Sequence, residues 1–393
     1  KWAVEEAKKR NIQIHAWIWV LASGNDRHNS LVSLPDDYPG PILSKHPEWM
    51  LIGEKGNTRP DNQHEFWLDP SDQNARNYII SMAEEIVKNY DVDGIHLDYI
   101  RYPFQSDNNL MGFNKSSLDQ FEKDTGYRIM EINQNTINAW NAWKENKINT
   151  FVKDISTSLR KIKPDITISA AVFGKNNNYR KSTIQQNWEL WVNNGWVDML
   201  NPMIYALNKD SLQNNLAYFN ESINKNVLIY PGIAFKNLDV PEIAEQMNTI
   251  TNQGLLGYSI FAVAFLNDEK LDFLKGNNTL LPSKNNLYEA SLFLNEYNLY
   301  IISFLENSSE IDENHYNNLA SLINESNSLI TQLNSPSPDI KNIKLNITNF
   351  KIISQNMLNK EFKYYQSRLK ILNSYVSRAE ILVNLELKKL KTN

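Results

Sequence analysis

The chain has 393 residues, a length typical of two or three domains, and its 41% hydrophobic content is enough for a sizeable core. Its formal net charge of −5 argues against nucleic-acid binding as the main function. Cysteine is absent, which excludes disulfides, thiolate catalysis and cysteine-based zinc sites. No apolar run approaches the ~18 residues of a membrane-spanning helix.

Short β-rich runs alternate with helical stretches over the first two thirds of the chain, after residues 1–10, which have the pattern of the end of an amphipathic helix. Alternating β and α units predict a parallel sheet with helices outside it. The predicted strands are Ile12–Val20, Gly94–Tyr99, Thr167–Phe173, Met199–Tyr205, Val227–Gly232 and Tyr258–Ala262, and the predicted helices include Asn74–Asn89, Ile148–Lys161, Ile184–Asn193 and Pro241–Gln253.

Six such units in ~270 residues fit a doubly wound sheet or a (β/α)8 TIM barrel. No G-x-G-x-x-G turn follows any predicted strand, which removes the main sign of a dinucleotide-binding sheet and favours the barrel. Six strands are two fewer than a barrel needs, and the chain starts inside a helix at Lys1 rather than with Met. We therefore expect the first two strands of the barrel to be missing from this chain.

Composition divides the chain near residue 280. Every Trp and every Gly lies at or before Gly276, and beyond it apolar residues recur at steps of three and four. The predicted domains are an α/β barrel at 1–276, a linker at 277–286 and a bundle at 287–393. We expect three antiparallel helices in the bundle, with a break at Pro336 and Pro338, and a role as a spacer or docking module.

Side-chain alternation gives three of the predicted strands one polar and aromatic face. In a parallel barrel the active site lies at the carboxyl ends of the strands, so such a face is expensive as a core and suits a sugar-binding cleft. The residues on this face are His15, Trp17 and Trp19 in the first strand, His96 and Asp98 in the second, and Asn201, Met203 and Tyr205 in the third.

Asp98 is the only carboxylate at the carboxyl end of a predicted strand, which indicates a catalytic role. The alternative is a buried aspartate paired with Arg101, a residue that is itself more suited to clamping a substrate than to transferring a proton. His15 and His96 are predicted to donate to substrate hydroxyls, with a satisfied core histidine as the alternative for each.

Other acidic residues have structural explanations. Asp93 and Asp198 stand at strand starts, on the stability face of a barrel. Asp69 is predicted to cap the helix that follows, with Pro70 at its first position and Asp72 reaching back.

No metal site or cofactor is expected. The histidines show no ligand spacing, and neither a G-x-S-x-G elbow nor a phosphate-binding G-x-x-x-x-G-K-[ST] loop is present.

An ordered set of motifs resembles the bacterial glycosyl-hydrolase-like family 10, over about residues 1–265. The most specific is the string from Asp93 to Pro103, D-G-I-H-L-D-Y-I-R-Y-P. The others are His15-Ala16-Trp17, His46-Pro47-Glu48-Trp49, Trp67-Leu68-Asp69-Pro70, Ser169–Gly174, Gln186-Asn187-Trp188 and Asn201–Tyr205.

The resemblance implies a TIM-barrel glycosidase, extracytoplasmic in most members, some of which act on cell-wall or biofilm glycans built from amino sugars. It places an essential aspartate at Asp98, and cleft-lining residues at His15, Trp17, Arg101 and Tyr205. Three functions stay open: a hydrolase of a bacterial amino-sugar polymer, a glycan-binding barrel of the envelope without turnover, and a barrel with lyase or isomerase chemistry.

Glycoside hydrolysis normally needs two carboxyl groups, one protonated and one ionised. The sequence does not choose the partner of Asp98. The candidates for the second group are Glu48, Asp61, Glu65, Asp107, Glu189, Asp268 and Glu269.

Overall fold

The computed structural model describes residues 1–10, 12–105, 110–129, 133–219, 227–276, 286–307, 312–361 and 366–392. The chain forms two compact units, one made of residues 1–7 and 13–199 and the other of residues 8–12 and 200–393. The division into a barrel at 1–276 and a bundle at 287–393 stays a prediction. Residues 277–285 of the predicted linker lie outside the described residues.

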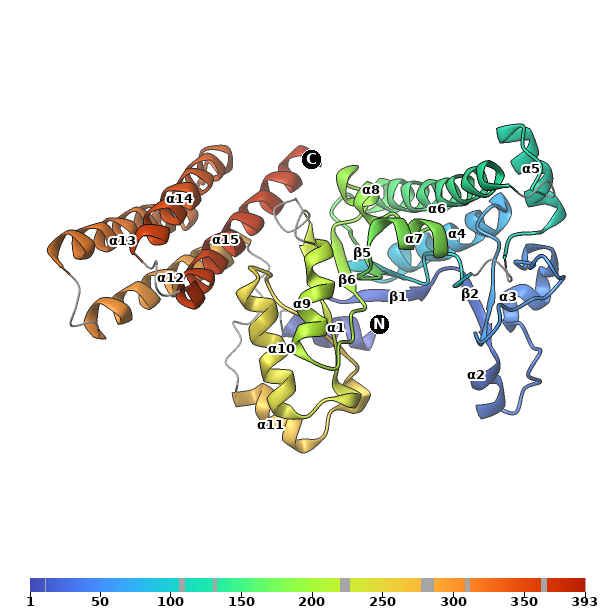
Figure 1. Ribbon diagram of the computed structural model, residues 1–393, viewed down its shortest axis with the longest axis horizontal. Coiled ribbons are helices and arrows are strands. Elements are labelled where there is room, and N and C mark those ends of the chain that lie inside the picture. Colours follow the sequence, from blue (N-terminus) through green and yellow to red (C-terminus); the bar gives the residue numbers. More distant parts are fainter. Residues whose placement is uncertain are drawn as a thin grey trace. The chain divides into compact units, whose positions relative to one another are not determined.

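Parallel strands form the centre of the first unit (Figure 1). Strand β4 (Gly94–Asp98) pairs on one side with β1 (His15–Trp19) and on the other with β5 (Thr167–Val172). The strand order continues through β6 (Met199–Pro202) to β7 (Leu228–Ile229), which gives five strands. Five of the six predicted strands are thereby confirmed in place, although each is shorter than predicted.

Alternation along β4 determines which side chains enter the core. Ile95 and Leu97 are fully buried, as is Ile168 of the neighbouring strand. Helices α4 (Gln73–Asn89) and α6 (Gln134–Ile162) pack against each other in the same unit (Figure 1). The unit is therefore a mixed α/β fold, as the sequence predicted.

Aspartates at the starts of strands hold neighbouring strands together. The Asp93 carboxylate accepts a hydrogen bond from the backbone N–H of Ile14 at 2.9 Å, and Asp198 accepts one from Ile168 at 2.8 Å. These contacts confirm the structural roles predicted for both residues.

The capping prediction for Asp69 is wrong. Helix α4 begins at Gln73, and its N-cap is Asp72, whose carboxylate accepts from the N–H groups of Asn74 and Ala75. Asp69 is buried instead, where it accepts hydrogen bonds from Ser71 and Ser117. Aspartate is a preferred N-cap residue at either position, so the sequence alone does not show at which of the two the helix begins.

A two-stranded antiparallel sheet was not predicted. It pairs β2 (Ala22–Asn25), which follows β1 closely, with β3 (Glu65–Trp67). The intervening chain forms α2 (Asp26–Leu31), α3 (Gly40–Lys45) and the 3-10 turn η1 (Pro47–Trp49). Strands of three and four residues are too short for alternation to be recognised in the sequence.

The other helices of the first unit are short or terminal. They are α1 (Trp2–Lys9), α5 (Lys115–Thr125), α7 (Asn177–Thr183) and α8 (Trp188–Asn193). Phe121 of α5 packs against Trp140 and Trp143 of α6. The long helix α6 was predicted to begin only at Ile148, and this aromatic cluster lies in the additional part at its N-terminal end.

The second unit contains a parallel pair of strands, β8 (Gly232–Ala234) and β9 (Ser259–Phe261). Around them lie α9 (Lys209–Leu216), η2 (Ala217–Phe219), η3 (Phe235–Asn237), α10 (Val240–Asn252), η4 (Val263–Phe265) and α11 (Asp268–Gly276). In the described residues the strands thus form one five-stranded and two two-stranded sheets. The fold is an α/β fold with a parallel sheet and C-terminal helices.

Four helices, not the three predicted, follow residue 285 in the described part of the chain. They are α12 (Asn286–Asn307), α13 (Glu313–Leu333), α14 (Ile340–Glu361) and α15 (Gln366–Thr392). The predicted break at Pro336 and Pro338 is confirmed, since α13 ends before it and α14 begins after it. Neither Gly nor Pro occurs in the sequence between α14 and α15, so this extra division could not be predicted from turn-forming residues.

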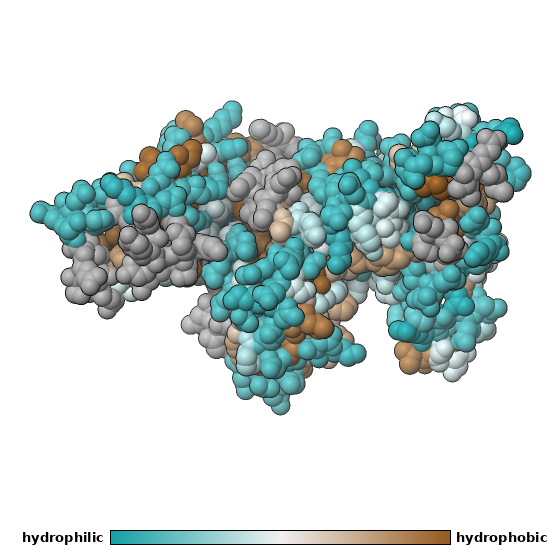
Figure 2. All heavy atoms as spheres, in the orientation of Figure 1, coloured by the Kyte–Doolittle hydropathy of each residue, from teal (hydrophilic) through white to brown (hydrophobic). Residues whose placement is uncertain are grey.

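Hydrophilic residues cover most of the described surface on the face shown in Figure 2, and hydrophobic residues form small separate patches. Helices such as α4 and α13 are amphipathic and bury their apolar side. Within the described ranges, none of the helices has the length and hydropathy needed to cross a membrane.

Candidate active site

Asp98 is the last residue of β4 and lies at the carboxyl end of the parallel sheet, as predicted. Its side chain is held by two donors: the Trp17 indole Nε1–H binds Oδ2 at 3.1 Å, and the backbone N–H of Tyr99 binds Oδ1 at 2.7 Å. Tyr99 has a positive φ of 54°, which turns the chain away immediately after the strand. Asp98 itself is only 9% exposed.

Burial raises the pKa of Asp98 above the ordinary aspartate value. The Tyr99 N–H, the Trp17 indole and the positive charge of Arg101 oppose this effect without cancelling it. A carboxyl group that keeps its proton to a higher pH is suited to general-acid chemistry.

Arg101 is buried and does not pair directly with Asp98 in the part of the chain that the structure describes. Its guanidinium donates to the backbone carbonyl of Tyr102 at 2.9 Å. Burial lowers its pKa to about 10, so it stays positively charged at neutral pH. The guanidinium stacks over the rings of Trp67, Tyr99, Phe104 and Phe173, at 4.7–5.5 Å from the ring centroids. It therefore acts on Asp98 through its charge, not as a direct ion-pair partner.

Aromatic rings surround the acid. Trp17 is 56% exposed, although its N–H is bound to Asp98, so one indole face is open to solvent directly beside the carboxyl group. Trp19 packs between His28 and Tyr99, with ring centroids 5.7 and 4.8 Å apart. Exposed indoles next to a carboxyl group can stack on the apolar face of a sugar ring.

The unpredicted β2–β3 pair brings Glu65 to this site. The phenol of Tyr99 donates to Glu65 Oε1 at 3.3 Å, and the amide of Asn25 donates to the same oxygen at 3.2 Å. Trp67, two residues further along β3, lies edge-on to the Tyr99 ring at 5.5 Å. Glu65 was one of seven open candidates in the sequence, and its position depends on a pairing that alternation does not reveal.

His15 and His96 meet at Ser169 of β5. The Nδ1 atom of each ring lies 3.0 Å from the Ser169 hydroxyl, which also donates to the backbone carbonyl of Ile95. Burial lowers the pKa of both, that of His96 to about 4, so both are neutral at pH 7. His15 is the first residue of β1, four residues or ~13 Å along the strand from the level of Asp98. Substrate binding by these histidines stays a prediction, and their contacts favour the core alternative.

Asn201 and Tyr205 belong to the second unit. Asn201 donates to the Ser259 hydroxyl at 2.7 Å, while Tyr205 packs on Phe261 with ring centroids 5.2 Å apart. A Cβ atom on Gly232 would lie 2.8 Å from the Tyr205 ring, so only glycine allows the ring this position. Their role in substrate binding stays a prediction.

The other candidate carboxylates have different surroundings. Glu48 pairs with His46, and Glu189 pairs with the buried Arg180. Asp61 is exposed, and Asp268 and Glu269 open α11 in the second unit. Asp107 lies outside the described residues. Among the residues that are described, no three His, Asp or Glu side chains are grouped so that they could hold a metal ion.

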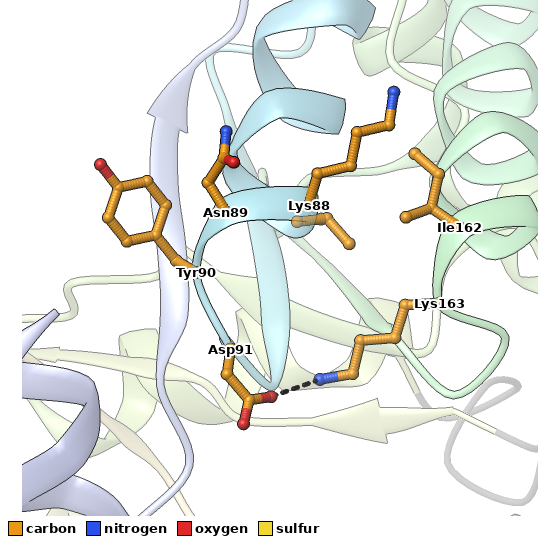
Figure 3. A pocket seen from close by; sticks show the side chains of 7 residues that line it. Lys88, Asn89, Tyr90, Asp91, Ile162 and Lys163 are labelled. Atoms are coloured by element: carbon orange, nitrogen blue, oxygen red, sulfur yellow. Dashed lines mark hydrogen bonds and ion pairs between the residues drawn. The ribbon is translucent and has the colours of Figure 1, made fainter.

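A surface depression of ≈ 510 Å³ lies elsewhere (Figure 3). It is formed where α4 and α6 end, by Val87–Asp91, Ile162 and Lys163, and an ion pair of 3.3 Å joins Asp91 to Lys163. Strand β4 begins just after this segment, so the depression is at the amino end of the strand that carries Asp98 at its carboxyl end. Active sites of β/α folds lie at the carboxyl ends, so the depression is not the candidate site.

The described chain thus combines a parallel α/β sheet with a buried acid at the carboxyl end of one strand. The profile of the glycosyl hydrolase-like 10 family matches residues 2–249, and the chain belongs to that family.

Among curated proteins, the chain is similar to glycosyl hydrolase YngK of Bacillus subtilis, with 26% identity over 216 residues that cover 51% of this chain and 38% of YngK. It is also similar to glycosyl hydrolase DigH of Escherichia coli K12, with 22% identity, covering 51% of this chain and 45% of DigH. The chain therefore spans less than half the length of either relative.

Among solved structures, the fold is similar to the glycoside hydrolase domain of PgaB (BpsB) from Bordetella bronchiseptica, with a TM-score of 0.53 and 11% identity. The match covers 70% of this chain and 78% of that domain.

Proposed function

We propose that the protein is a glycoside hydrolase in which Asp98 is the general acid. The observation that carries the proposal is the position of this acid: it is 9% exposed, has a raised pKa, and lies at the carboxyl end of a parallel strand beside the open face of Trp17. Membership of the glycosyl hydrolase-like 10 family and the similarity to proteins named glycosyl hydrolases support it.

The proposed substrate is a bacterial amino-sugar polymer of the peptidoglycan type or a related envelope glycan, and the proposed location is the cell envelope or the medium outside the cell. Both follow from the family resemblance. We also propose that the parallel sheet is part of a (β/α)8 barrel. We propose further that the positive charge of Arg101 limits how far burial raises the pKa of Asp98.

The test is incubation of the protein with peptidoglycan, peptide-free glycan strands and a deacetylated glucosamine polymer, followed by mass spectrometry of the products. We expect new reducing ends from at least one polymer and a loss of 10²–10⁴-fold for Asp98→Asn, about the range of general-acid contributions. Turnover retained by Asp98→Asn would remove this residue from the mechanism.

The exposed indole of Trp17 specifically favours one alternative, a glycan-binding protein without turnover. Binding of a polymer that releases no product, and that is lost in Trp17→Ala but kept in Asp98→Asn, would favour this alternative over hydrolysis.

A further inference from the structure

We propose that Glu65 is the second carboxylate of the reaction and that it acts as the base on the attacking water. This inference rests on the proposed hydrolase function and adds the group that the sequence left open.

Tyr99 connects the two carboxyl groups. Its backbone N–H binds Asp98 Oδ1 at 2.7 Å, and its phenol O–H binds Glu65 Oε1 at 3.3 Å. One residue therefore fixes both acids, on the carboxyl end of β4 and on β3 of the adjoining pair. The backbone nitrogen and the phenol oxygen that bind the two carboxyl groups stand at opposite ends of Tyr99, and from this we infer the wider ~6.5–9.5 Å spacing of inverting enzymes, in which water fits between the carboxyl groups.

Arg101 interacts electrostatically with both acids. The negative charges of both Asp98 and Glu65 act on its buried guanidinium, which stacks on the Tyr99 ring at 5.5 Å from the centroid. Among the described residues, no other carboxylate acts on Arg101 in this way. Glu48 and Glu189, by contrast, are engaged by His46 and Arg180.

Tyr99 is a positioning residue and not the nucleophile. Burial, with the nearby charges of Glu65 and Asp98, raises the pKa of the phenol well above its ordinary value, so it stays protonated and continues to donate to Glu65. The Asn25 amide holds the same oxygen, which leaves Oε2 of Glu65 to receive a proton.

Asp98 gives its proton to the glycosidic oxygen as the bond from that oxygen to the anomeric carbon breaks. A water oxygen forms the new bond to the anomeric carbon, and Glu65 takes the proton that this water loses. The products are two sugar chains, with a protonated Glu65 and an ionised Asp98 that exchange protons with solvent before the next turnover.

The first experiment compares Glu65→Gln with Glu122→Gln, a matched change at an exposed residue of α5 that pairs with Arg128. Glutamine keeps an oxygen to accept from Tyr99 and Asn25, so circular dichroism and the thermal midpoint should match those of the unchanged protein. On the polymer that the unchanged protein cleaves, we expect kcat to fall 10²–10⁴-fold with little change in KM, whereas Glu122→Gln keeps full activity.

Further measurements separate a catalytic role from a structural one. Azide should restore turnover to Glu65→Ala and yield a glycosyl azide of inverted configuration, and Tyr99→Phe should lower kcat about tenfold while retaining the fold. NMR of the first product should show inversion.

Activity of Glu65→Gln within about threefold of the unchanged protein, with Asp98→Asn inactive, would overturn the assignment of Glu65 and leave the proposed function standing. A retained anomer would overturn its role as base. An unchanged protein that cleaves none of the polymers would overturn the proposed function itself.

Discussion

The indole N–H of Trp17 donates to Oδ2 of Asp98 across two neighbouring parallel strands, at 3.1 Å. The residue directly opposite Asp98 in the register is Trp19, so Trp17 reaches its partner along the diagonal. The contact joins the most exposed aromatic ring of β1 to the most buried acid of the site.

Trp17→Phe removes this hydrogen bond and keeps an aromatic face. Since the bond favours the ionised carboxylate, its loss should raise the pKa of Asp98 further. An acid that must be protonated then stays active to a higher pH, so the alkaline limb of the kcat/KM profile should move upward. Trp17→Ala serves as a second variant: it removes the aromatic face as well as the hydrogen bond, so it should raise KM, which Trp17→Phe should not. A limb that moves downward would contradict Asp98 as the general acid.

Asp98→Asn should be at least as stable as the unchanged protein at neutral pH. The folded-state pKa of Asp98 is raised above 3.8, so the folded form holds the proton more tightly than the unfolded form. Its contribution to stability is therefore complete below pH 3.8 and is lost as pH rises through the folded pKa. Thermal midpoints of the two proteins should converge as the pH falls toward 3. Midpoints that stay equally far apart at pH 3 and at pH 7 would contradict the raised pKa of Asp98.

Gly94→Ala should destabilise the protein by about 1–3 kcal/mol, because a Cβ atom there would lie 2.7 Å from the His15 ring. Urea unfolding measures the change. In a His15→Ala background the clash is removed, so the same substitution should cost much less. Equal costs in both backgrounds would show that the ring is not what requires glycine.

Lys144 of α6 is fully buried, donates to Gln105 at 2.8 Å, and lies over the rings of Tyr102 and Trp140. Burial lowers its pKa to about 7 from 10.5, so the folded form releases a proton that the unfolded form keeps. Stability should therefore rise as pH increases from about 7 to 10.5.

Lys144→Met should remove this rise and give a higher thermal midpoint at pH 7, by several degrees. Lys123→Met, at an exposed position of α5, is the matched control and should keep the slope. A Lys144→Met protein with the same pH slope as the unchanged one would place the titrating group elsewhere.

Sequence alternation predicted the position of Asp98 because one face of its strand is consistently apolar. Ile95 and Leu97 occupy one face of β4, which places Asp98 on the other. In the structure Ile95 and Leu97 are fully buried, and Asp98 ends the strand. The same reasoning placed His15 and Trp17 on a common face, but alternation does not show how far along the strand each residue lies from the acid. The register places His15 at the start of β1, beside Gly94 and Ser169, far from the acid.

The sequence by itself determined the α/β class, the acid at the end of β4, the break before α14 and the family, because each depends on local pattern or on an ordered set of motifs. Only the tertiary structure decided the antiparallel pairing of β2 with β3, the division of the last helical stretch in two, and the contact between Tyr99 and Glu65. The reason is physical: Glu65 lies 33 residues before Asp98 in the chain, and no local periodicity encodes which distant strand ends meet.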